Sequence, residues 1–95
     1  MPQDQPDKVV SITLNASGLP VPDQDPVPVR KGSQKVRWSA GFPFTIDIEN
    51  YSDVQYSSGG GTHTCKTGYF ADVKPYKYSI TSNGVTNDPT LDIQP

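Results

Sequence analysis

Large apolar residues recur at every second position in several short stretches of this chain, and nowhere do they recur at helical spacing. The clearest stretch is residues 44–49 (FTIDIE), where apolar and polar side chains alternate strictly. Side chains at i and i+2 of a strand lie on one face, so this pattern predicts a strand with one buried side. Residues 7–14, 35–39 and 75–81 alternate in the same way, and we expect a strand at each.

Proline and glycine separate these stretches from one another. The chain has ten prolines and eight glycines, and the prolines crowd into residues 15–28, which predicts an irregular connection there. Val27 and Val29 suit a strand only at the edge of a sheet, because proline cannot donate a hydrogen bond to a ladder. The three consecutive glycines at 59–61 predict a flexible loop tip or a turn with positive φ.

The C-terminal half supplies the remaining elements. We expect a short threonine-rich strand at residues 62–66 and a long loop at residues 68–75. Asn83-Gly84 predicts a two-residue hairpin turn, because a type I′ turn needs positive φ at both central positions. Leu91 and Ile93 belong to the returning strand. Together the chain predicts about seven short strands in an antiparallel sandwich or barrel.

The domain organisation follows from length and from the absence of any linker or repeat. The chain has 95 residues, enough for one domain with a modest core, and we expect a single domain over 1–95 with residues 1–6 flexible. Residues 1–7 are polar, with no cationic start and no apolar run, so we expect no signal peptide and no membrane span. A cytoplasmic protein is the simplest expectation, and a secreted mature chain is the alternative.

The C-terminal pattern resembles that of a known group. Its elements are YKYSIT at 76–81, NGV at 83–85, DP at 88–89 and LDIQP at 91–95. It resembles small bacterial proteins of the DP-EP type, which have a Tyr-x-Tyr-x-Val/Ile strand, an Asp-Pro pair and a final apolar strand ending in Glu-Pro. Gln94 stands where that group has glutamate.

The wider pattern is similar to that of cupredoxins. Residues 36–38 (VRW) and 44–46 (FTI) resemble the strand pair that precedes the first copper histidine, and residues 76–78 resemble the strand leading to the ligand cysteine. The resemblance implies a Greek-key β-sandwich, cupredoxin-like or immunoglobulin-like. A type 1 copper site needs two histidines and a thiolate. The chain has one histidine, and Ile80 stands at the cysteine position, so we expect no copper.

His63 and Cys65 are the chain's only histidine and only cysteine, and they lie two residues apart. On a strand they share a face, but zinc or copper would need further ligands, from Asp53, Asp72 or a second chain. A cysteine–histidine dyad would need a residue that orients the base, and none is identifiable. We therefore expect a small buried cysteine beside a solvated histidine, with no metal, no cofactor and no enzymatic activity.

Aromatic residues gather around the long loops. Either their rings fill the open ends of the sandwich core, or they form a binding surface, since binding sites are commonly built on the loops of a rigid scaffold. The second interpretation, together with the lone histidine, gives these candidate binding residues: Tyr51, Tyr56, His63, Tyr69 and Asp72.

The charge balance limits the partners. The net charge of −2 opposes attraction to phosphate, so the basic residues at 30–37 suit a solvated strand edge and not a nucleic-acid interface. We expect a non-enzymatic interaction module that contacts a protein or glycan partner through its aromatic loops. One alternative is an intermolecular metal or redox protein that uses His63 and Cys65. Another is a structural protein that self-assembles as a homo-oligomer through exposed sheet edges.

Overall fold

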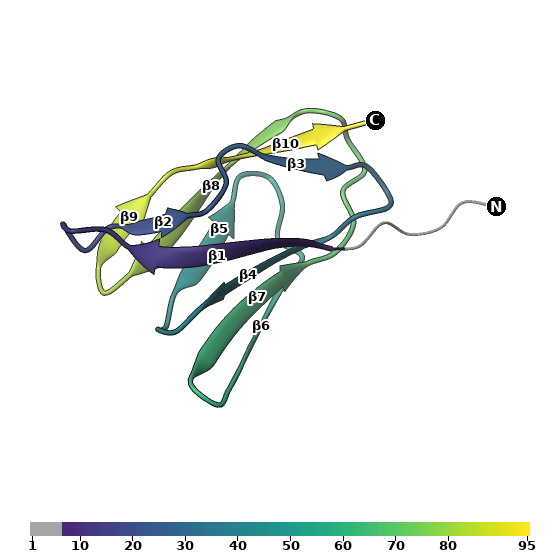
Figure 1. Ribbon diagram of the computed structural model, residues 1–95. Helices are drawn as coiled ribbons and strands as arrows, with labels where there is room; N and C mark the ends of the chain where they lie inside the picture. Colours follow the sequence, from purple (N-terminus) through teal and green to yellow (C-terminus); the bar gives the residue numbers. More distant parts are fainter. Residues whose placement is uncertain (1–6) are drawn as a thin grey trace.

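The computed structural model describes residues 7–95, which form two packed β-sheets (Figure 1). The flexible segment expected at 1–6 lies outside these residues. The strands are β1 (Lys8–Leu14), β2 (Pro20–Pro22), β3 (Val27–Arg30), β4 (Val36–Ala40), β5 (Thr45–Ile48), β6 (Val54–Gly59), β7 (Thr62–Thr67), β8 (Pro75–Ser82), β9 (Val85–Asn87) and β10 (Thr90–Gln94). The prediction of an all-β sandwich is confirmed.

The two sheets have the strand orders β2-β1-β4-β7-β6 and β3-β10-β8-β5, with β9 paired to β8 beside the second. Most neighbours are antiparallel, as expected, but β1 pairs with β4 and β3 with β10 in parallel. Both sheets are therefore mixed. In each parallel pair the two strands are far apart in the sequence, so the chain has room to return in the same direction.

Three of the ten strands in residues 7–95 were not expected from the sequence. β2 and β9 have three residues each, too few for an alternation to be visible. β6 has six residues, and nearly all of its side chains are polar and exposed, so it has no buried face to produce the alternating pattern. The strands that the alternation predicted are all present.

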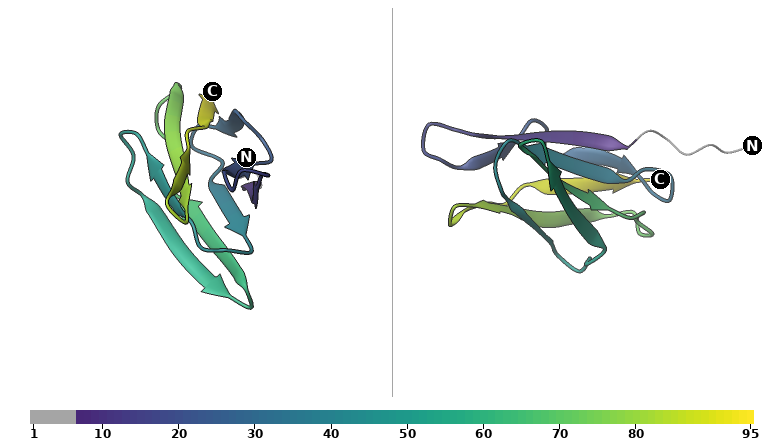
Figure 2. Two further views of the ribbon diagram at one scale, coloured as in Figure 1. Left: turned by 90° about the vertical axis from the view of Figure 1, so that its left-hand side faces the viewer. Right: turned by 90° about the horizontal axis from the view of Figure 1, so that it is seen from below.

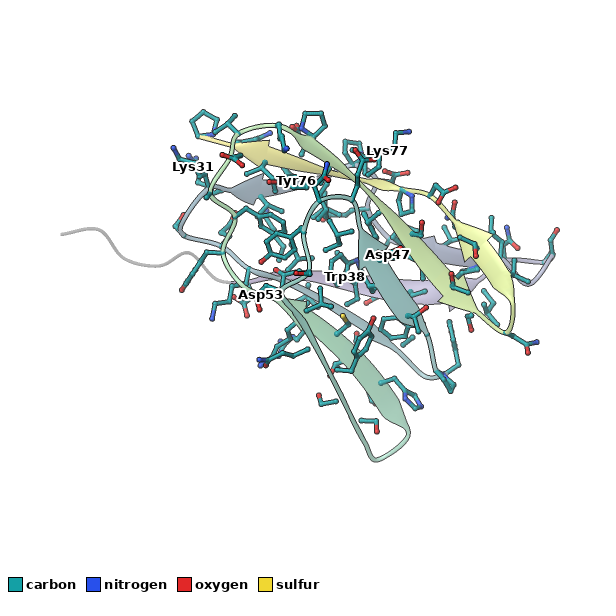
Figure 3. The ribbon with its side chains drawn as sticks, turned by 180° about the vertical axis from the view of Figure 1, so that it is seen from behind. Lys31, Trp38, Asp47, Asp53, Tyr76 and Lys77 are labelled. Atoms are coloured by element: carbon teal, nitrogen blue, oxygen red, sulfur yellow. The ribbon has the colours of Figure 1, made fainter. Side chains whose placement is uncertain are left out.

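The core lies between the sheets and is built around an aromatic pair. Trp38 on β4 and Tyr78 on β8 are both fully buried, with ring centroids 5.2 Å apart. The indole Nε1 of Trp38 donates a hydrogen bond of 3.2 Å to the Tyr78 hydroxyl, so the buried polar atoms of both rings are satisfied. Figure 3 shows Trp38 pointing into the space between the sheets. The pair joins the two sheets at their centre.

Two hairpins have two-residue turns with positive φ. Asn83 and Gly84 have φ of 52° and 79°, which confirms the predicted turn at the end of β8. The strand that returns from it is β9, so the expectation that Leu91 and Ile93 lie on the returning strand is wrong: both lie on the separate strand β10, which pairs with the other half of β8. Gly60 and Gly61 have φ of 61° and 84° and form the same kind of turn between β6 and β7. The resulting β6–β7 hairpin extends past the neighbouring strands, as Figure 1 and the left view of Figure 2 show.

Candidate functional site

The structure divides the sequence-predicted residues between two places. Tyr51 and Tyr69 lie together at one end of the sandwich, where the Tyr51 hydroxyl donates to the Tyr69 carbonyl oxygen at 3.3 Å. Tyr56 and His63 lie on the β6–β7 hairpin and line a common groove. Asp72 is exposed in the loop between β7 and β8. The five residues therefore do not form one site.

The Tyr51 ring is partly buried and packs against the core. It stacks on Phe70 with centroids 4.3 Å apart and meets Tyr76 edge-on at 6.2 Å. Burial raises the pKa of the Tyr51 hydroxyl, and the nearby Asp53 carboxylate raises it further. Tyr51 and Phe70 thus fill one end of the sandwich, which is the alternative interpretation of the aromatic loops.

Tyr69 is more exposed than the partly buried Tyr51 beside it, with 44% of its surface exposed. The Lys35 ammonium lies 4.8 Å from the centroid of its ring. A cation placed over an exposed ring contributes about 0.5–1 kcal/mol. Tyr69 is therefore accessible to a partner, but one of its faces is already covered by a lysine.

Tyr56 connects the two sheets through its hydroxyl. The hydroxyl oxygen accepts a hydrogen bond from the Ile46 peptide N–H at 2.9 Å, and the hydroxyl donates to the Ile46 carbonyl at 3.0 Å. Ile46 lies on β5, the last strand of its sheet, so these two bonds occupy the side of β5 that faces away from β8. Burial is the main cause that raises the pKa of Tyr56. The ring itself is half exposed.

A groove lies between the hairpin and the connection from β4 to β5. Its volume is about 270 Å³, and it is open to solvent. Pro43 and Phe44 line one side, and the half-buried His63 lies on the other with Tyr56. Enclosed pockets for small-molecule ligands usually have roughly 300–1,000 Å³. A side chain of a larger partner suits this shallow groove better than a free small molecule does.

Cys65 is fully buried, whereas His63 is only half-buried. The two residues share a face of β7, as expected, but Cys65 has 0% exposure. It lies opposite Trp38 on one neighbouring strand and opposite Tyr56 on the other. Burial raises the pKa of the Cys65 thiol from 9.0 to about 11, which keeps it protonated at neutral pH. Within residues 7–95 no cluster of three His, Cys, Asp or Glu side chains is placed to hold a metal ion.

The feature that the sequence did not reveal is the outer edge of β6. A two-residue turn closes on a hydrogen-bonded pair, here Gly59 with Thr62, and ladder bonds then recur at every second residue of β6. The peptide groups of Tyr56 and Ser58 therefore point away from β7. No strand among the described residues pairs with that side of β6. The Val54 N–H also points away from the ladder and donates to the Ser52 carbonyl.

Other edges of the two sheets carry features that block strand addition. β2 has only three residues and includes Pro20 and Pro22. β3 contains Pro28, and the Gln34 side chain accepts a hydrogen bond from the Arg30 N–H at 2.8 Å. Natural sheet edges are commonly protected by proline, by charge or by short length. β6 has neither proline nor charge along its six residues. That uncharged, proline-free run before Gly60-Gly61 was the available sequence signal.

No model of a known protein family matches this chain, and neither does any curated protein. The resemblance to DP-EP-type and cupredoxin-like proteins stays a prediction from the residues. Among residues 7–95 we find no helix of the length and apolar character that a membrane span requires.

Proposed function

We propose that this chain is a non-enzymatic interaction module that binds an extended segment of a partner protein along β6. The observation that carries the proposal is the unpaired row of peptide groups at Tyr56 and Ser58 on a projecting hairpin. Strand addition of this kind draws its affinity from main-chain hydrogen bonds and its specificity from pockets for alternate side chains. The groove beside the hairpin supplies such a pocket.

A protein partner is favoured over a glycan by the spacing of these groups. Donors and acceptors recur at every second residue along the edge of β6, which is the repeat of another extended polypeptide. The apolar side of the groove, Pro43 and Phe44, suits an apolar side chain. The ring of Tyr51 is stacked on Phe70, which leaves less aromatic surface at the loop end for a sugar. The proposal therefore moves the binding surface from the aromatic loops to the hairpin.

The state of Cys65 supports a role without catalysis. Its thiol is buried and its pKa is raised to about 11, whereas a nucleophilic cysteine needs a lowered pKa and access to solvent. An intermolecular metal or redox site at His63 and Cys65 would require the hairpin to move, because Cys65 is fully buried in the core and cannot reach a second chain. We therefore favour the interaction module over that alternative.

The test compares two substitutions at one position. Ser58→Pro removes an outward N–H while leaving the ladder to β7 intact, and Ser58→Ala keeps that N–H. Both variants and the parent chain are screened against a library of extended peptides and against a glycan array. We expect peptide binding by the parent and by Ser58→Ala, and loss of binding in Ser58→Pro. Glycan binding that survives Ser58→Pro, with no peptide bound, would overturn the proposal.

A further inference from the structure

We infer that the strand received by β6 is β6 of a second copy of this chain, so that two hairpins pair antiparallel about a twofold axis at Tyr56. The inference rests on the proposed function in one respect, namely that β6 is the docking edge. It adds the identity of the partner, the direction of the strands and their register. A symmetric pair of this kind uses the same surface on both copies.

The available hydrogen-bonding groups fit this register. An axis at Tyr56 places the N–H and C=O of Tyr56 opposite those of the same residue in the second copy, and the two exchange a pair of hydrogen bonds. Ser58 then lies opposite Val54 of the other copy, where the Ser58 N–H donates to the Val54 C=O. The Val54 N–H already donates to Ser52 at 2.9 Å, so only its carbonyl is needed in the interface.

The side chains also fit a symmetric pair. On the face of the sheet that is turned away from the core, Gln55 lies opposite Ser57 of the second copy, and both side chains can donate and accept hydrogen bonds. On the inner face Val54 meets Ser58, and the two Tyr56 rings lie side by side. β6 has no charged residue, so the twofold axis brings no like charges directly opposite each other. The nearest cation in the ladder is Lys66 on β7, opposite Gln55 and one strand away from the interface.

The size of the contact sets the expected strength. Pairing over residues 54–58 of each copy buries less surface than the roughly 1,200–2,000 Å² typical of stable complexes. We therefore expect a weak dimer with a dissociation constant in the range of roughly 10 µM to 1 mM. The projection of the hairpin leaves the edge of β6 accessible to a second copy (Figure 1).

The first experiment is analytical ultracentrifugation of the full chain over a wide concentration range. We expect the parent and Ser58→Ala to shift from monomer to dimer with the same concentration dependence. Ser58→Pro should weaken the dimer at least about tenfold, because each copy loses one interfacial donor. Circular dichroism and thermal unfolding establish that Ser58→Pro is folded. A monomer at every concentration in the parent chain would overturn the inference.

A second experiment tests the register by charge and does not rely on proline. In the proposed pair, the two copies of Ser57 lie diagonally across the interface, within reach of long side chains. Ser57→Lys and Ser57→Glu should each be more monomeric than Ser57→Gln, the uncharged control. A mixture of Ser57→Lys and Ser57→Glu should recover the dimer, and added salt should weaken that recovery.

The outcomes separate this inference from the proposed function. A parent chain that stays monomeric but binds peptides in a Ser58→Pro-sensitive manner refutes self-pairing and leaves the module intact. If the dimer is insensitive to Ser58→Pro and the Ser57→Lys and Ser57→Glu variants do not complement each other, the chains associate through another surface. That result refutes the inference. Failure of peptide binding in every variant, together with a dimer that follows the Ser57 charges, supports self-pairing and overturns the broader module.

Discussion

The outer edges of β5 and β6 lie next to each other on one side of the sandwich, and they differ in whether their peptide groups have hydrogen-bond partners. The outer side of β5 is occupied: the Tyr56 hydroxyl bonds both peptide groups of Ile46, and the Tyr51 N–H donates to the Ile48 carbonyl at 3.2 Å. The outer side of β6 is unoccupied at Tyr56 and Ser58. The same tyrosine therefore closes the neighbouring edge with its side chain and leaves its own backbone open.

The difference separates stability from interaction. Ile46 is 4% exposed, so losing a partner for its peptide groups would cost the fold about 1–3 kcal/mol. The peptide groups of β6 meet water, and water satisfies them without cost to the fold. An edge can thus be left for a partner only where solvent reaches it, and in this protein that condition is met on the projecting hairpin.

The largest expected effect is in amide hydrogen exchange of the dilute monomer. We expect the Ile46 amide to exchange about a thousandfold more slowly than the Ser58 amide, since the first opens only with the fold and the second is exposed to water. Two-dimensional NMR in deuterated buffer measures both amides in one sample. Similar exchange at the two amides would remove the contrast between the edges.

Removal of one oxygen atom tests the closure of β5 directly. Tyr56→Phe keeps the ring and leaves the Ile46 peptide groups without their partner, so we expect a loss of about 1–3 kcal/mol in the free energy of unfolding. Tyr51→Phe is the matched control, because its 3.3 Å hydrogen bond is exposed and should contribute about 0.5–1 kcal/mol. Urea unfolding followed by circular dichroism measures both. Equal losses would show that the Tyr56 link has no special role.

Alkaline pH should weaken the same closure. The fold raises the pKa of Tyr56 and raises that of Cys65 from 9.0 to about 11, so the folded state prefers both groups protonated. Their contribution to stability is therefore complete below about pH 9 and decreases as pH rises from 9 to 11. Urea midpoints measured from pH 8 to pH 11 should fall, and less steeply in Cys65→Ala. A midpoint that rises over this range would contradict the burial of both groups.

The smallest expected effect is at the aromatic loop end. Tyr69→Ala removes a ring that is largely in solvent and its contact with Lys35, so we expect a loss of at most about 1 kcal/mol in stability. Dimer formation along β6 should be unchanged, because Tyr69 lies at the aromatic loop end and not on the β6–β7 hairpin. Ultracentrifugation beside the parent chain measures this. Loss of binding in Tyr69→Ala would return the site to the loops.

The sequence predicted the parts of the molecule in which burial imposes a pattern. Alternation located β5 and β8, and Asn83-Gly84 located the hairpin turn, because each depends on neighbouring residues alone. The sequence could not predict that the Tyr56 hydroxyl bonds the peptide groups of Ile46. The two residues are ten positions apart, and their contact depends on how the two sheets pack. The sequence also missed β6, because a strand without a buried face has no alternation. Alternation of apolar and polar residues therefore located the strands of the core but could not locate the candidate edge of β6.

The buried pair of Trp38 and Tyr78 gives the protein an intrinsic optical probe. Trp38 is the only tryptophan in the chain, so all indole fluorescence originates from one position between the sheets. Its emission will change when the sheets separate and water reaches the ring. Association along β6 leaves that contact in place, so dimer formation should be silent in fluorescence while unfolding is not. One unlabelled sample can therefore distinguish a chain that has found a partner from a chain that has lost its fold.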